Sequence, residues 1–146
     1  MMNETTGRPI IVLVGHGGLP QGMLDAAEMI LGKQGGVHVI TLAPGEDPED
    51  LGRRLTALTA EALAQDGAHD LLVLGDLFGG SPANAAAAAT MRNPLMELVT
   101  GLNLPMLLEV LTAGGSAHEA ARVATTAGSE GVVDVRTRLE GSAEKS

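Results

Sequence analysis

An uninterrupted apolar run near the N-terminus constrains the fold of this chain more than any other feature. Residues 9–14 read Pro-Ile-Ile-Val-Leu-Val and lead into the turn Gly15-His16-Gly17-Gly18. A run without polar alternation is typical of a strand that is buried on both faces, as in a parallel sheet covered by helices. A second such run, residues 71–74, ends at Gly75-Asp76. Two strands of this kind indicate an α/β protein.

Helical segments alternate with the predicted strands. Helix starts are marked by Asp47-Pro48 and Ser81-Pro82, and Ser116 with Glu119 predicts a capping box. Residues 104–112 are ambiguous, although an early proline favours a helix. We expect strands at residues 9–14, 37–42, 71–75, 95–100 and 132–136, and helices at residues 20–31, 48–66, 83–91, 104–112 and 117–126.

This alternation predicts an α/β fold of three layers, a doubly wound and mostly parallel sheet between two layers of helices. Right-handed crossovers and short connections favour the strand order 2-1-3-4. Ligands of such sheets bind beyond the carboxyl ends of the central strands, and His16 follows the first strand while Asp76 follows the third. The topology therefore brings these two residues together. A chain of 146 residues predicts one domain, over residues 9–136, with residues 1–8 and 137–146 as flexible termini.

The composition argues against several classes of function. A net charge of -9 disfavours nucleic-acid binding, which needs a basic face. The lack of cysteine excludes thiolate catalysis and Cys-ligated metals, and the four histidines are too scattered for a metal site. No cofactor is expected. The sequence shows neither a signal-like N-terminus nor an apolar run of about 18 residues, so we expect a cytoplasmic protein.

His16 is the one histidine at the predicted switch point, which makes it the candidate nucleophile. A neutral imidazole attacks phosphorus with one ring nitrogen while an acceptor holds the other. Asp76 is the candidate acceptor, because a carboxylate fixes the tautomer and stabilises positive charge on the ring. The turn around His16 alone fits a buried structural histidine equally well. Its joint position with Asp76 favours a histidine that carries a phosphoryl group.

The segment after Asp76 is the candidate phosphoryl-binding site. Gly79, Gly80 and Ser81 open a helix, whose N–H groups and dipole favour an anion. The Ser81 hydroxyl is a candidate donor to the phosphoryl oxygens, with N-capping as its alternative role. Gly17 keeps the space beside the imidazole open.

An apolar docking rim is expected around the imidazole. Phe78 is the one aromatic residue of the chain, and its place in the turn itself predicts that it is exposed. Leu19, Pro20 and Met23 are further rim candidates, although core packing suits Met23 at least as well. The acidic run at residues 46–50 is expected to be a solvated helix start, with steering of a basic partner as the lesser alternative.

Four segments resemble the IIA component of the mannose-family sugar phosphotransferase system, and the resemblance covers residues 9–135. The segments are Ile11-Val12-Leu13-Val14-Gly15-His16-Gly17, Ala27-Glu28-Met29-Ile30-Leu31-Gly32, Leu74-Gly75-Asp76-Leu77-Phe78-Gly79-Gly80-Ser81-Pro82-Ala83-Asn84-Ala85-Ala86 and Gly101-Leu102-Asn103-Leu104-Pro105-Met106-Leu107-Leu108-Glu109.

The resemblance implies a phosphotransferase in which His16 accepts phosphoryl from the phosphocarrier HPr and passes it to a histidine of a IIB domain. Asp76 would be the hydrogen-bonded partner of His16, Ser81 would line the phosphoryl site and Asn103 would lie near its rim. Members of the family are homodimers in which a C-terminal strand helps to join the subunits, and the predicted strand at residues 132–136 fits that use.

Two alternatives remain open, one within the family and one with a similar fold. Many members carry a IIB domain in the same chain, whereas this one ends after the IIA pattern, so a separate IIB protein is expected. The membrane would be reached only indirectly, through IIC and IID proteins, and the sugar is not specified. Without a IIB partner, the phosphorylation state of His16 would itself be the output of a regulatory protein. The second alternative is the phosphoryl-donor subunit of dihydroxyacetone kinase.

Overall fold

The computed structural model describes residues 7–66 and 70–145. Residues 1–6, part of the expected flexible N-terminus, and His69, one of the four scattered histidines, lie outside the described residues. The strands are β1 (Ile10–His16), β2 (Val37–Leu42), β3 (Leu71–Gly75) and β4 (Met96–Thr100). The helices are α1 (Leu19–Leu31), α2 (Pro48–Asp66), α3 (Ser81–Arg92), α4 (Leu104–Thr112), α5 (Ala117–Glu130) and α6 (Val135–Lys145).

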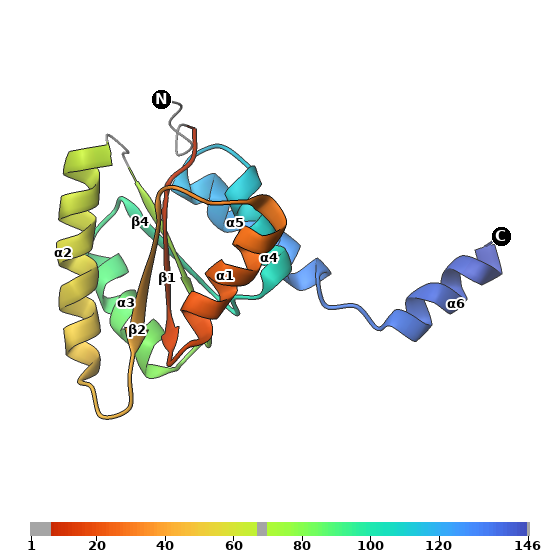
Figure 1. Cartoon of the computed structure of the whole chain (residues 1–146), viewed down its shortest axis with the longest axis horizontal. Helices are drawn as coiled ribbons and strands as arrows, with labels where there is room; N and C mark the ends of the chain where they lie inside the picture. The colour runs from red at the N-terminus through yellow and green to blue at the C-terminus, as the bar shows by residue number, and fades with distance from the viewer. Residues whose placement is uncertain (1–6, 67–69, 146) are drawn as a thin grey trace.

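The four strands form one parallel sheet in the order β2-β1-β3-β4, as predicted. Helices α2 and α3 cover one face, and α1, α4 and α5 cover the other (Figure 1). Alternate residues of β1 point into the two layers: Val12 and Val14 pack with α2 and α3, whereas Ile11 and Leu13 pack with α1 and α4. This alternation explains why β1 reads as an unbroken apolar run.

The core is aliphatic and tightly layered. The central strands β1 and β3 bury all their apolar side chains completely. On α3, the buried residues Ala83, Ala86 and Ala89 carry only methyl groups, so this helix can lie close to the sheet. Aliphatic side chains, including these alanines, thus fill the core in place of aromatic ones.

The predicted strand at residues 132–136 is wrong. Residues 132–134 form no strand, and α6 begins at Val135 and continues through the tail to Lys145. The carboxylate of Asp134 accepts a hydrogen bond from the Thr137 N–H at 3.2 Å, which is the bond of a helix cap, and Arg136 pairs with Glu140 one turn on at 3.3 Å. These local bonds outweigh the strand preference of the valines. Figure 1 shows α6 extending away from the rest of the chain.

Other boundaries differ by less. Residues 104–112 form helix α4, as Pro105 favours, and α5 continues to Glu130. Asp47 accepts a hydrogen bond from the Glu49 N–H at 3.0 Å at the start of α2, as predicted. None of the helices in the described part of the chain is long and apolar enough to cross a membrane.

Candidate functional site at the carboxyl edge of the sheet

The prediction that His16 and Asp76 lie together is confirmed. His16 is the last residue of β1, and Asp76 follows β3, which pairs directly with β1. One carboxylate oxygen of Asp76, Oδ2, accepts the backbone N–H of His16 at 3.0 Å and lies 2.8 Å from its ring Nδ1. Because a carboxylate only accepts hydrogen bonds, this contact favours the tautomer with the proton on Nδ1.

The two partners differ in exposure. The side chain of His16 is 51% exposed, whereas that of Asp76 is only 7% exposed. A half-exposed ring is not the buried structural histidine that the turn sequence alone also allowed. With Nδ1 facing Asp76, Nε2 is the ring nitrogen with a lone pair left for an incoming group. The arrangement is suited to nucleophilic chemistry at Nε2.

His16 borders a pocket of about 480 Å³ at the carboxyl ends of β1 and β2. The opposite wall is the loop between β2 and α2, where the Glu46 carboxylate accepts the Ala43 N–H at 2.6 Å. The pocket is lined by His16, Gly17, Leu42, Ala43, Pro44, Gly45, Glu46, Pro48 and Ser81. Gly17 and Ser81, two of the predicted phosphoryl-binding residues, therefore line the same pocket as the imidazole.

The glycine-rich turn differs in detail from the prediction. The N–H of Gly80 donates to the Leu77 carbonyl at 3.2 Å, so it is already used within the turn. Gly80 is the N-cap of α3 and Ser81 its first residue, and no side chain caps this helix. The Ser81 hydroxyl is thus not committed to capping. The first N–H groups of a helix have no acceptor within it, so the start of α3 still offers donors to an anion.

The glycines beside the imidazole contribute space and backbone conformation. Gly17 (φ 55°) and Gly79 (φ 84°) adopt positive φ angles that side chains disfavour. The N–H of Gly17 donates to the Leu42 carbonyl at 3.1 Å, so it is not a donor for a ligand. A Cβ on Gly80 would lie 3.1 Å from Cε1 of His16, which is tighter than ordinary contact.

Exposed apolar side chains surround this edge of the sheet. Phe78 is 87% exposed, Leu77 58% and Leu19 45%, and these three residues are hereafter the apolar rim. Pro20 is buried and Met23 is half-buried in the layer of α1 and α4. Leu77 was not among the rim candidates expected from the sequence. Its position beside Phe78 in the same turn would have indicated that it belongs there.

The side chain of Asn103 is used at helix ends. Its Oδ1 accepts the Met106 N–H at 3.0 Å and caps α4, and its Nδ2 donates to the Gly128 carbonyl in α5, also at 3.0 Å. This bonding gives Asn103 a structural role that joins α4 to α5.

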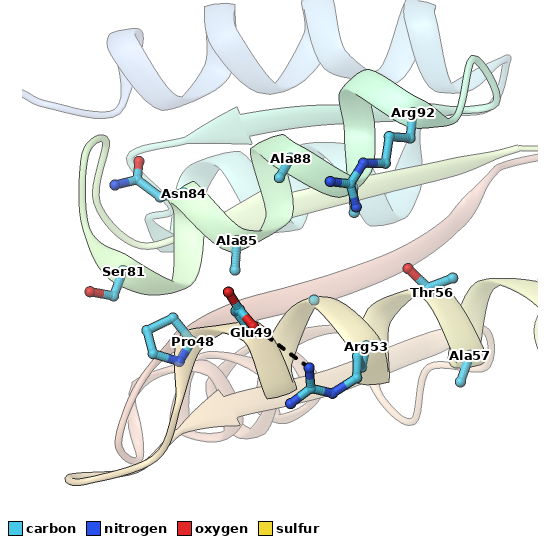
Figure 2. Close-up of a pocket in the computed structure, with 12 residues that line it drawn as sticks. Pro48, Glu49, Arg53, Thr56, Ala57, Ser81, Asn84, Ala85, Ala88 and Arg92 are labelled. Carbon is cyan, nitrogen blue, oxygen red and sulfur yellow. Dashed lines mark ion pairs between the residues drawn. The ribbon is translucent and has the colours of Figure 1, made fainter.

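A groove of about 860 Å³ lies between α2 and α3 and shares Pro48 and Ser81 with the pocket at His16. Figure 2 shows its alanine-lined side on α3 and the ion pair between Glu49 and Arg53 on α2. A hydrogen bond and charge attraction from Asp50 raise the pKa of Arg53. Arg53 is therefore held by carboxylates of its own helix, and the groove is lined as well by Arg92 of α3. Within the described residues, no group of three or more side chains is arranged to hold a metal ion.

Comparisons with known proteins agree with this fold. The family model described as PTS system fructose IIA component (EIIA-man) matches residues 10–127. The chain is 36% identical over 131 residues to the mannose-specific EIIAB component of the phosphotransferase system (PTS) of Escherichia coli K12, covering 88% of this chain and 40% of that protein. It is 31% identical over 102 residues to the fructose-specific EIIA component of Bacillus subtilis, covering 70% and 68%.

A solved structure gives the same result. The mannose/sorbose specific IIA subunit of Enterococcus faecalis matches with a TM-score of 0.78 and 28% identity, over 86% of this chain and 93% of that one. The fold and the sequence define a IIA component of a sugar phosphotransferase system. The chain belongs to the mannose-type IIA family, EIIA-man. It spans 40% of the length of the Escherichia coli EIIAB relative.

Proposed function

We propose that this protein accepts a phosphoryl group from phospho-HPr on Nε2 of His16 and passes it to a histidine of a IIB domain, for sugar uptake. The observation that carries the proposal is the contact of 2.8 Å between His16 Nδ1 and the buried Asp76 carboxylate. It leaves Nε2 as the nucleophile and aims a negative charge at the ring that becomes positive during transfer.

The transfer exchanges one nitrogen–phosphorus bond for another. The Nε2 lone pair attacks phosphorus, the bond to the donor imidazole breaks, and its electron pair returns to the donor ring. The proton on Nδ1 of His16 stays in place, held by Asp76. Because the bonds formed and broken are alike, the protein must supply mainly in-line positioning and charge stabilisation. The Ser81 hydroxyl and the start of α3 serve as donors to the phosphoryl oxygens.

The surroundings of His16 suit docking of protein partners. The apolar rim of Leu19, Leu77 and Phe78 supplies exposed apolar area next to the reacting atom, which a docked partner would bury. The acidic residues at the start of α2 favour a partner with a basic face. In this scheme the protein acts in the cytoplasm and meets the membrane only through its IIB partner and the IIC and IID proteins.

A homodimer is part of the proposal. Val132, Val135 and Leu139 are 78%, 62% and 64% exposed in the C-terminal arm, here defined as residues 132–145. Apolar side chains grouped on an extension of the chain favour burial against a second copy. In place of the strand expected from the sequence, α6 and the residues before it would make this contact.

Phosphorylation of the purified protein by phospho-HPr tests the central claim. We expect one acid-labile, base-stable phosphoryl group per chain, and its complete loss in His16→Ala with an unchanged circular dichroism spectrum. His118→Ala is the matched control, because His118 is an exposed histidine in the first turn of α5. Labelling that persists in His16→Ala would refute the assignment.

A further inference from the structure

Gly15 is the one residue of β1 without a side chain, although nothing in its backbone requires glycine. Its φ angle is not in the left-handed region, and it pairs within the sheet with Thr41. A glycine in a strand interior is less favourable than alanine, because it loses more backbone freedom on folding. Its five predecessors in β1 are all branched aliphatic residues that are completely buried. The reason for a glycine at this position must therefore be space.

The neighbours of Gly15 show what occupies that space. A Cβ at this position would lie 2.9 Å from Oδ2 and 3.0 Å from Cγ of Asp76, and 3.0 Å from Cγ of Pro20. These separations are shorter than ordinary van der Waals contact. The atom in closest conflict is Oδ2, the same oxygen that binds both the backbone N–H and the ring of His16.

The pleat of the strands explains the conflict. Side chains alternate along a strand, so Gly15 belongs to the face of Ile11 and Leu13, toward α1, and His16 belongs to the opposite face. The alternation in β3 directs the residue after Gly75 toward α1 as well. The Asp76 carboxylate therefore reaches the His16 ring by passing over the position that a side chain at residue 15 would fill.

We infer that Gly15 is a positioning residue for phosphoryl transfer. Because residue 15 has no side chain, the Asp76 carboxylate has the space to reach the His16 ring. This inference rests on the proposed function, because it concerns the same imidazole. A methyl group at residue 15 would push the Asp76 carboxylate away from Nδ1. The proton of the His16 ring would then no longer be fixed on Nδ1, and the negative charge of Asp76 would lie farther from the ring.

Gly15→Ala tests the inference, with Gly75→Ala as the matched control. A Cβ on Gly75 would meet its three nearest neighbours at 3.5 Å, an ordinary contact, at the same edge of the sheet. We expect Gly15→Ala to slow single-turnover transfer from phospho-HPr by at least about tenfold, because a positioned acid–base group typically contributes about a hundredfold or more and the methyl group displaces Asp76 without removing it. Gly75→Ala should stay within about twofold of the native rate, because its added methyl group makes only ordinary van der Waals contacts, and its nearest neighbours are Val14, Ala83 and Thr100 rather than Asp76 or His16. An unchanged rate in Gly15→Ala would overturn the inference.

A double-mutant cycle separates positioning from general damage. In an Asp76→Ala background the carboxylate is gone, so Gly15→Ala should slow transfer no further, whereas independent effects would multiply. If Gly15→Ala does not fold alone, its thermal midpoint should recover in the double variant Gly15→Ala/Asp76→Ala. Multiplying effects, or a double variant that stays unfolded, would each show that the methyl group acts elsewhere.

Nitrogen-15 NMR of the unphosphorylated protein gives a readout that does not depend on transfer. The ring nitrogens of His16 should report a proton fixed on Nδ1 in the native protein and in Gly75→Ala, and a mixture of tautomers in Gly15→Ala. An unaltered pattern in Gly15→Ala would contradict the positioning role. If the native protein showed the fixed tautomer but no labelling by phospho-HPr, the proposed function would fail while the geometry stood.

Discussion

One carboxylate oxygen of Asp76 holds His16 twice, through the backbone N–H at 3.0 Å and at the ring Nδ1 at 2.8 Å. The shared oxygen fixes the ring relative to its own backbone. An asparagine at residue 76 keeps the size of the side chain but removes its charge. We predict that Asp76→Asn slows single-turnover transfer to His16 by at least about tenfold, because the positive ring in the transition state loses its counter-charge.

The aspartate at the other end of β3, Asp70, supplies the control for Asp76→Asn. Asp70 precedes the strand at its other end, and its Oδ2 accepts the Ala117 N–H at 2.8 Å. Asp70→Asn therefore makes the same chemical change on a carboxylate that caps a helix, far along the strand from the imidazole. Quenched-flow transfer rates should be near native for Asp70→Asn. Equal rates for the two variants would remove Asp76 from the mechanism.

The apolar rim predicts a contribution of Phe78 to partner affinity. The ring is 87% exposed in the turn beside His16 and is the only aromatic side chain in the sequence. An anchor of this kind typically contributes at least about 1 kcal/mol to an interface, or about fivefold in Kd. We expect Phe78→Ala to weaken binding of HPr, measured by calorimetry, by at least that factor, with the thermal midpoint unchanged.

Met29→Ala is the matched control for the rim. Met29 is 88% exposed on α1, about 15 Å along the helix from the rim residue Leu19. Loss of this equally exposed apolar side chain should leave HPr affinity unchanged. If Met29→Ala weakened binding as much as Phe78→Ala, exposure in general rather than the rim would account for the effect.

The fold and the central pair of the site were predictable from the sequence because both follow from patterns that topology fixes. Apolar runs without alternation specify strands buried on both faces, and the parallel order 2-1-3-4 then requires β1 and β3 to end side by side. His16 and Asp76 are placed by that rule alone. No knowledge of side-chain packing was needed to bring them together.

Features that depend on detailed geometry, rather than on the order of the elements, were not predictable. The role of Gly15 arises where Asp76 and Pro20, which are distant in sequence from one another, meet over a single backbone position. The Gly80 N–H is lost to the Leu77 carbonyl, a detail of turn geometry. At the C-terminus the valines predicted a strand, but the cap at Asp134 favoured a helix.

The capping box of α5 predicts a pH dependence of stability. Ser116 Oγ accepts the Glu119 N–H at 3.1 Å, and the Glu119 carboxylate accepts the Ser116 N–H at 3.2 Å. The hydrogen bonds from Ser116 hold the pKa of Glu119 below its usual value of 4.5. Its contribution to the free energy of unfolding is therefore fully present above that value and is lost as the pH falls through the lowered pKa.

Chemical denaturation near neutral pH and below the usual glutamate value measures this contribution. The native protein should lose more stability between the two conditions than Glu119→Gln does. At neutral pH, Ser116→Ala should cost about 1 kcal/mol. Thr125→Ala, an exposed change in the middle of the same helix, should cost less than Ser116→Ala, since alanine is the better helix former. Identical pH profiles for the native protein and Glu119→Gln would contradict the assignment.

The C-terminal arm predicts how the proposed homodimer can be separated. Val135 and Leu139 are one turn apart on α6 and are both exposed in the single chain. A carboxylate on each would place two charges in the contact between copies, and burying an unpaired charge costs more than such a contact contributes. We therefore expect Val135→Glu/Leu139→Glu to be a monomer by light scattering, while the native protein and Thr137→Glu remain dimers. Thr137→Glu is the control because Thr137 lies between the two positions on another face of the helix.

Transfer from phospho-HPr should continue in the monomer, since His16, Asp76 and Ser81 all come from the body of one chain. A dimer that survives both glutamates, or a native protein that is itself monomeric, would show that the arm does not join two copies.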